Sequence, residues 1–115
     1  MRRPSDWIRR VGESIARRFP ARDGDPHQER IDRLRARGVR IGTACWILSE
    51  GFSTEPWLVE IGDRVAISGG VQFVTHEGSA WLLRDRHPNL QAFGRIRVGD
   101  DSLIGLNAKI GRAHV

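Results

Sequence analysis

Aliphatic residues recur at intervals of six through the middle of the chain. Three copies of one pattern carry this period: Val39 to Ile47, Val59 to Ile67 and Ile96 to Ile104. Each copy has an aliphatic residue, a glycine directly after it, a small residue at the fifth position of the six, and then the next aliphatic residue. A helix repeats its apolar face every three to four residues and a strand every two, so this period indicates short extended segments separated by sharp turns.

The period predicts a chain that coils, with each group of six residues forming one flat side. We expect Ile61, Ile67 and Phe73 to supply three sides of one triangular coil, with Val65 and Val71 as further inward positions. The glycine of each group is expected to take the turn conformation that other residues resist. The sequence therefore predicts an all-β solenoid.

The spacing also indicates where the coil is interrupted. From Ile41 to Ile61 the offset is 20 residues, three periods plus two, and the excess falls in the turn-like residues 53–56. From Ile61 to Val98 the offset is 37 residues, six periods plus one. The apolar residues expected at every sixth position stop after Phe73. We therefore expect residues of about 77–94 to leave the coil as a loop, and loops of this length are commonly functional or disordered.

The N-terminal part has a different pattern. Residues 1–22 carry seven arginines beside an apolar stripe at helical spacing, and residues up to 26 read as a linker. Such a helix could lie on an anionic membrane surface, or it could pack on the coil or on a partner chain. Residues 27–38 are expected to form a short helix that ends at Gly38 and caps the coil, which then occupies residues 39–108.

Charge and composition narrow the function. The net charge is +5, but the arginines lie largely in the N-terminal arm and the capping helix without a nucleic-acid motif, so we expect no nucleic-acid partner. No segment has the roughly 20 apolar residues of a membrane span, and no signal peptide is evident. Cys45 is the single cysteine and is expected to be a packed thiol. These features favour a cytoplasmic protein, with peripheral contact at the inner membrane surface through residues 1–22 as an addition.

The repeat and two further phrases resemble a known family. Over residues 33–108 the chain resembles the hexapeptide-repeat acyltransferases, and the phrases Glu55 to Asp63 and Phe73 to Gly78 resemble the branch that O-acetylates sugars in polysaccharide and cell-envelope pathways. The resemblance implies a left-handed parallel β-helix and a homotrimer with active sites between subunits. It also implies acetyl-CoA as co-substrate, a sugar or glycan acceptor, and no metal.

The resemblance implies that His76 is the general base, which removes a proton from an acceptor hydroxyl as that oxygen attacks the thioester. An imidazole suits this role because its unperturbed pKa of about 6.5 leaves it largely neutral at working pH. Glu77 could orient the ring, although strand alternation points it to the other side. His87, in the same loop, is the second candidate, with simple exposure as its alternative.

Other side chains are candidates for substrate or cofactor binding. Trp57 and Trp81 flank the loop, and their indole faces suit a sugar ring or the adenine of a coenzyme, although packing is the commoner use. Asn107, at the end of the resembling stretch, is a further candidate. Trp46 is expected to pack on a neighbouring subunit or on the preceding helix, and His27 is expected to face solvent.

The last residues read as a foreign tail. Residues 110–115 match the translation of a common sequencing adapter, and Lys109 is the only lysine of the chain. We expect residues 109–115 to be non-native and the parent protein to continue with further repeats, so that this chain alone is poorly active.

Two other functions stay open. One is a zinc carbonic anhydrase of the γ-class type, which needs three converging histidines. The other is a non-catalytic scaffold.

Overall fold

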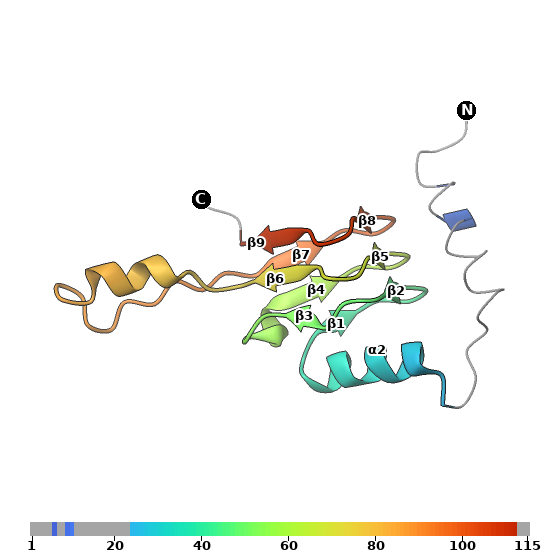
Figure 1. Ribbon diagram of the computed structural model, residues 1–115, viewed down its shortest axis with the longest axis horizontal. Helices are drawn as coiled ribbons and strands as arrows, with labels where there is room; N and C mark the ends of the chain where they lie inside the picture. Colours follow the sequence, from blue (N-terminus) through green and yellow to red (C-terminus); the bar gives the residue numbers. More distant parts are fainter. Residues whose placement is uncertain (1–5, 7–8, 11–23, 113–115) are drawn as a thin grey trace.

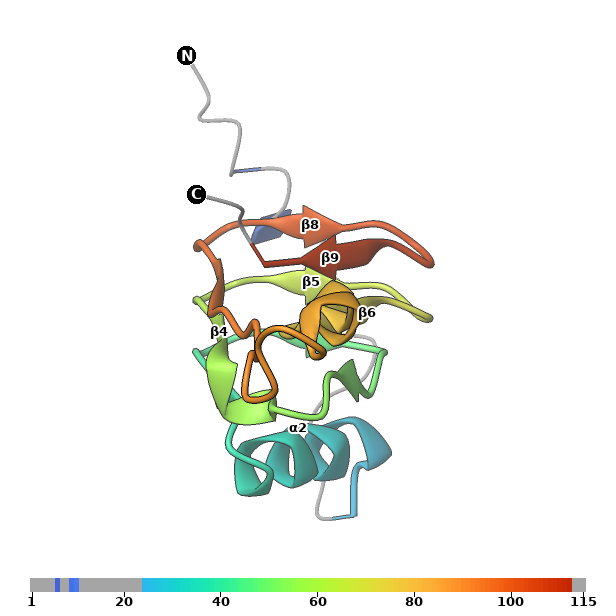
Figure 2. The ribbon, with the colours of Figure 1, turned by 90° about the vertical axis from the view of Figure 1, so that its left-hand side faces the viewer.

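A computed structural model describes residues 6, 9, 10 and 24–112. Within them, short parallel strands build three sheets that the chain visits in rotation. The first sheet holds β1 (Arg40–Ile41), β4 (Val59–Ile61) and β7 (Ile96–Val98); the second holds β2 (Trp46–Ile47), β5 (Ala66–Ile67) and β8 (Leu103–Ile104); the third holds β3 (Gly51–Phe52), β6 (Gln72–Val74) and β9 (Lys109–Gly111). One pass through the three sheets is called a layer, and Figure 2 shows the three layers stacked on one another.

The strands pair at the repeated aliphatic positions. Ile41 lies opposite Ile61, and Ile61 lies opposite Val98, which are the offsets of 20 and 37 residues read from the sequence. Since parallel neighbours in register stack like on like, the inward side chains of successive layers meet in one interior.

This interior is the hydrophobic core. Ile61, Ile67 and Phe73 come from three different sheets and are at most 2% exposed, and Val65 and Val71 are buried beside them, as predicted. Phe73 stacks on Phe52 of the layer below, with ring centroids 4.8 Å apart. Each such side chain stabilises the fold by roughly 1.5–3 kcal/mol through burial.

The fold class predicted from the sequence, an all-β left-handed parallel β-helix, is wrong. The described residues form three separate open sheets, and no sheet closes on itself or runs on as a solenoid. They also include an 11-residue α-helix and 3-10 helices of three and six residues. The physical reason is that strands of two or three residues pair only with their equivalents in the next layer, and corner residues keep the sheets apart.

The role predicted for the repeated glycines is also wrong. The left-handed conformation belongs to Ala44, Arg64 and Asp101, two residues after each glycine, with φ values of 55–56°. Gly42 is needed instead because the next layer approaches closely: a Cβ there would lie 2.6 Å from the carbonyl oxygen of Gly62. The glycine makes room for a backbone and is not the residue that turns.

Aspartates beside these glycines join the layers. The Asp63 carboxylate accepts a hydrogen bond from the backbone N–H of Thr43, 2.8 Å away in the layer below. Asp100 accepts in the same way from the N–H of Asp63, at 2.7 Å. These rungs satisfy amide groups at one corner that the short strands leave unpaired.

We expect Gly42→Ala to lower the free energy of unfolding by about 1–3 kcal/mol, because the new methyl group forces the first two layers apart. Gly105→Ala is the matched control, because a Cβ there meets nothing within 4 Å and the residue has no positive φ. Urea unfolding of both variants measures the difference. Equal midpoints would show that the close approach at Gly42 is not constraining.

Helix α2 (Pro26–Ala36) covers the first layer (Figure 1). Asp25 caps its start by accepting from the N–H of His27 at 2.9 Å, and Pro26 occupies the first turn, where its missing N–H costs nothing. Ile31 and Leu34 are buried against the core. The arginine of position 35 donates to the carbonyls of residues 41 and 42, both at 3.0 Å, so the helix is tied to the layer it covers.

His27 is not solvent-facing, which corrects the expectation from the sequence. Its Nε2 accepts a hydrogen bond from the N–H of Ile47 at 3.1 Å, and its ring stacks on Trp46 with centroids 4.2 Å apart. Trp46 therefore packs on the preceding helix, one of its two predicted contacts. Burial lowers the pKa of His27 below its usual 6.5, and the charge of Arg30 adds to the effect, while Asp25 opposes it.

This environment predicts a pH effect on stability. The unfolded chain protonates His27 near pH 6.5 and the folded chain only at lower pH, so stability is complete above about 6.5 and declines as pH falls toward the folded pKa. We expect His27→Gln, which retains an acceptor for Ile47, to show a smaller fall in melting temperature between pH 7.5 and 5. Parallel pH curves for the two proteins would contradict this assignment.

The chain leaves the layers after β6, close to where the aliphatic marks stop. The segment contains the 3-10 helix η2 (Gly78–Leu83) and projects from the stacked sheets (Figure 1). At its neck His76 and Phe93 form an antiparallel bridge. A shorter 3-10 helix, η1 (Pro56–Leu58), fills the turn between β3 and β4.

The predicted N-terminal arm, residues 1–22, lies outside the described residues apart from positions 6, 9 and 10, as do tail residues 113–115. Lys109–Gly111 of the predicted tail pair with β6. In the part of the chain that is described, no helix has the length and apolar character to cross a bilayer. The non-native origin of residues 109–115 stays a prediction.

Candidate functional site

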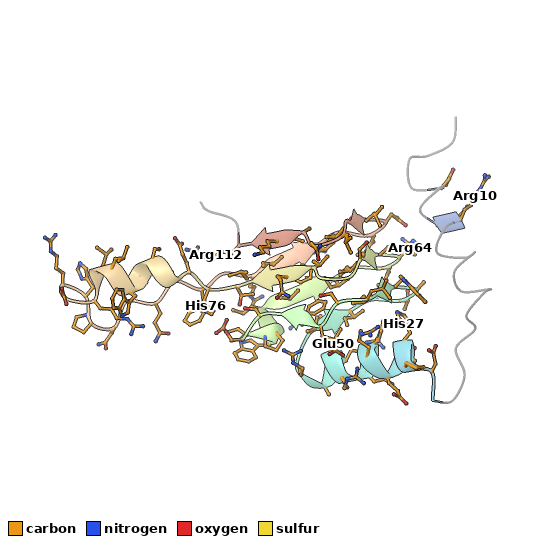
Figure 3. All side chains as sticks on the ribbon, in the orientation of Figure 1. Arg10, His27, Glu50, Arg64, His76 and Arg112 are labelled. Carbon is orange, nitrogen blue, oxygen red and sulfur yellow. The ribbon has the colours of Figure 1, made fainter. Side chains whose placement is uncertain are left out.

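His76 lies where the third sheet gives way to the projecting segment. It lies two residues after the end of β6, and its side chain is 43% exposed, while Thr75 before it is completely buried. Figure 3 shows the imidazole at the base of this segment. The Phe93 ring lies beside it with centroids 5.9 Å apart, tilted by 58°. The histidine is thus fixed on one side by the core and accessible on the other.

The imidazole contacts residues of the turn after β3. Its Nδ1 lies 3.0 Å from Oε2 of Glu55 and 3.2 Å from Oγ1 of Thr54. These partners precede His76 by 21 and 22 residues, which is one layer, because β3 pairs with β6 at an offset of 21. Stacking of two corners therefore brings the carboxylate to the ring.

Hydroxyl groups hold the Glu55 carboxylate. Thr54 donates to its Oε1 and Thr75 donates to its Oε2, both at 2.7 Å. Ser53 lies 2.7 Å from the Thr75 hydroxyl and accepts from the Thr75 N–H at 3.2 Å. The backbone of Ser53 is left-handed, with φ of 63°, and this tight turn aims Thr54 and Glu55 toward the histidine.

These hydrogen bonds set the charge of the carboxylate. The Thr54 hydroxyl, followed by the Thr75 hydroxyl and then His76, lowers the pKa of Glu55 from its usual 4.5 to about 2. A depressed carboxyl pKa favours the ionised form, so the interaction is complete above pH 4.5 and is lost only as pH falls through about 2. Glu55 is therefore an anion throughout the range in which an imidazole titrates.

A cleft of about 270 Å³ opens beside the histidine, between the layers and the projecting segment. His76, Phe93 and Trp81 lie in its wall, and the Trp81 side chain is one of the most exposed large apolar groups, at 69%. Arg84 supplies a cation to the same wall. The cleft combines an imidazole, aromatic faces and a charge, which is the composition of a site for a small polar molecule.

The predicted site residues are only partly brought together. Glu77 also lines the cleft, but its carboxylate accepts from Arg112 at 2.9 Å and from the Ser79 hydroxyl at 2.5 Å, so the carboxylate on the imidazole is Glu55. Trp81 lies in the wall, while the described residues around the cleft do not include Trp57, His87 or Asn107.

The remaining candidates lie elsewhere. Trp57 is 61% exposed in η1, near Gly38, and His87 is exposed within the projecting segment. Asn107 occupies the turn from β8 to β9, where its N–H donates to the carbonyl of Gly69 and its φ is 59°. The Asn107 side chain lies against Gly70, where a Cβ would clash with it, and its predicted role in binding stays a prediction.

The contact between Glu55 and His76 was not predicted from the sequence. A signal was present: the offset of 20 residues between Ile41 and Ile61, applied backward from Thr75, points to Glu55. Adjacency in the sequence drew attention to Glu77, whereas the carboxylate that contacts the imidazole lies one layer away.

A second hollow, of about 420 Å³, lies over the first sheet. Arg40, Glu60 and Arg97 stand in register across it. It contains no imidazole, so we place the candidate chemistry at His76. No group of three or more histidine, cysteine or acidic side chains that could hold a metal ion occurs among residues 6, 9, 10 and 24–112.

Comparisons with known proteins give one informative likeness. The chain is 40% identical over 82 residues to Protein CapG of Staphylococcus aureus. The matched region covers 69% of this chain and 48% of that protein. The chain thus spans about half the length of the curated relative that it matches. No family profile matches the sequence, and no solved structure matches it.

Proposed function

We propose that this chain is part of a hexapeptide-repeat acyltransferase that moves an acetyl group from acetyl-CoA to a hydroxyl of a sugar or glycan. The observation that carries the proposal is the imidazole of His76, which a carboxylate holds at one nitrogen in the wall of a cleft. The likeness to Protein CapG supports a role in polysaccharide biosynthesis.

The proposed reaction needs one base and no covalent enzyme intermediate. The imidazole takes the proton of the acceptor hydroxyl as that oxygen attacks the thioester carbonyl carbon, giving a tetrahedral oxyanion. The oxyanion collapses, the carbon–sulfur bond breaks, and the departing thiolate takes the proton from the imidazolium. Cys45 has no part in this chemistry, and burial raises the pKa of its thiol, which disfavours a nucleophilic thiolate.

The cleft suits an acceptor of limited size. Its volume of about 270 Å³ is close to the lower end for small-molecule sites, so one sugar unit is the fitting occupant. The exposed indole of Trp81 offers an apolar face to a sugar ring, and Arg84 offers a cation to an anionic substituent or to phosphate.

We extend the proposal to a homotrimer in which exposed apolar side chains of one copy contact other copies of the chain. Leu82 and Leu106 are 73% and 72% exposed. Exposed apolar side chains of this kind support an interface. Light scattering should then give three times the monomer mass.

The test is an acetyl-transfer assay with the product of the complete reading frame, run beside this chain. Acetyl-CoA is incubated with a panel of O-linked sugars and glycans, and transfer is followed by thiol release and by the added acetyl mass of the acceptor. We expect transfer to at least one sugar hydroxyl. Thiol release without acetylated product, or none with any acceptor, would refute the proposal.

A further inference from the structure

The hydroxyl groups around Glu55 fix where the protons of the site are. Thr54 and Thr75 each have one hydroxyl proton, and each directs it to the Glu55 carboxylate at 2.7 Å. An ionised carboxylate only accepts, so neither threonine has a proton left for another partner. Thr75 can still accept, and the Ser53 hydroxyl at 2.7 Å meets that need.

This inventory determines the role of the imidazole nitrogen Nδ1. It faces two oxygens, Oε2 of Glu55 at 3.0 Å and Oγ1 of Thr54 at 3.2 Å. Both oxygens are acceptors toward the ring, because the carboxylate has no proton and the threonine has already used its own. Nδ1 must therefore carry a hydrogen, since a bare nitrogen would face two lone pairs.

We propose that Glu55 is a positioning residue that keeps His76 in the Nδ1–H tautomer, so that Nε2 is the atom that takes the proton of the acceptor hydroxyl. The threonines act one step further out, by holding the carboxylate in place. The inference rests on the proposed function only for the identity of that proton. The tautomer itself is a property of the free protein.

Charge alone does not account for the arrangement. Glu77 is an equally charged carboxylate next to His76 in the sequence, but Arg112 and Ser79 bind it. Comparing the two glutamates therefore distinguishes the effect of a hydrogen bond to Nδ1 from the general effect of a nearby negative charge. Glu55→Gln and Glu77→Gln remove one charge each and leave the side-chain shapes nearly unchanged.

The test is ¹⁵N nuclear magnetic resonance of the histidine rings in this chain without any ligand. At alkaline pH, we expect a single tautomer of His76 with a protonated Nδ1 and a bare Nε2. Glu55→Gln should give a mixture of tautomers, and Glu77→Gln should keep the wild-type tautomer. A wild-type ring with a bare Nδ1 overturns the proposal even if both variants fail to fold.

Activity supplies a second readout. In the product of the complete reading frame, Glu55→Gln should lower kcat about tenfold or more with little change in KM, because the ring loses its orientation and not its substrate. Wild-type kcat with a wild-type tautomer in Glu55→Gln overturns the inference. Failure of the proposed function is distinct from this, since it would remove acetyl transfer from the wild type while the tautomer spectra remained as expected.

Discussion

Replacing His76 with alanine is expected to lower the kcat of acetyl transfer by about 10²- to 10⁴-fold, the usual contribution of a positioned general base. The KM for acetyl-CoA should change little, because the proposed role of the imidazole is to move a proton. The measurement is steady-state kinetics of the product of the complete reading frame with a sugar acceptor. Thermal melting should show an intact fold, because the side chain is 43% exposed and outside the core.

His87→Ala is the matched control for this result. His87 lies in the segment that projects after β6 and is exposed, and it is not one of the described residues that line the cleft. A larger loss in His87→Ala than in His76→Ala would transfer the role of base to His87. An unchanged kcat in both variants would show that neither histidine is the base.

Replacing Phe73 with alanine is expected to lower the free energy of unfolding by about 3–5 kcal/mol. The ring is 1% exposed and stacks on Phe52, so its loss opens a cavity between two layers where no side chain can collapse without moving a sheet. Domains of this size have total stabilities of about 5–15 kcal/mol. Urea unfolding followed by circular dichroism should show a large fraction of unfolded chains at low denaturant.

Phe93→Ala provides the comparison for Phe73, since it removes the same ring from an exposed position. Phe93 is 46% exposed and lies at the neck of the projecting segment. We expect its midpoint to shift by much less than that of Phe73→Ala. Similar shifts in the two variants would mean that the stacked layers are not the main source of stability.

The sequence predicted the core well because its signal is local. An apolar residue at every sixth position can be read directly from the sequence. Ile61, Ile67 and Phe73 are buried together, as that period requires. The class of fold was wrong, because the period does not reveal how far each sheet extends. The reason for Gly42 was also missed, since the contact that requires it lies with Gly62, 20 residues further along the chain.

The site was predicted in part for a similar reason. His76 stands in a recognisable phrase, whereas Glu55 acquires its meaning only when the corners of two layers stack. His27 was misjudged because its neighbours in the sequence are charged, while its partners Trp46 and Ile47 lie about 20 residues away. Contacts between segments about 20 residues apart decide these roles, and no window of adjacent residues contains them.

The aspartate rungs have a consequence for synthesis of the chain. The N–H of Thr43 donates to the carboxylate of Asp63, 20 residues downstream, and the N–H of Asp63 donates to that of Asp100, 37 residues downstream. During synthesis each of these N–H groups therefore leaves the ribosome before the aspartate that accepts from it. Water must accept its hydrogen bond until that aspartate has been translated. We expect protection of these amides from hydrogen exchange to appear stepwise in nascent chains of increasing length, in the order in which their acceptors are translated.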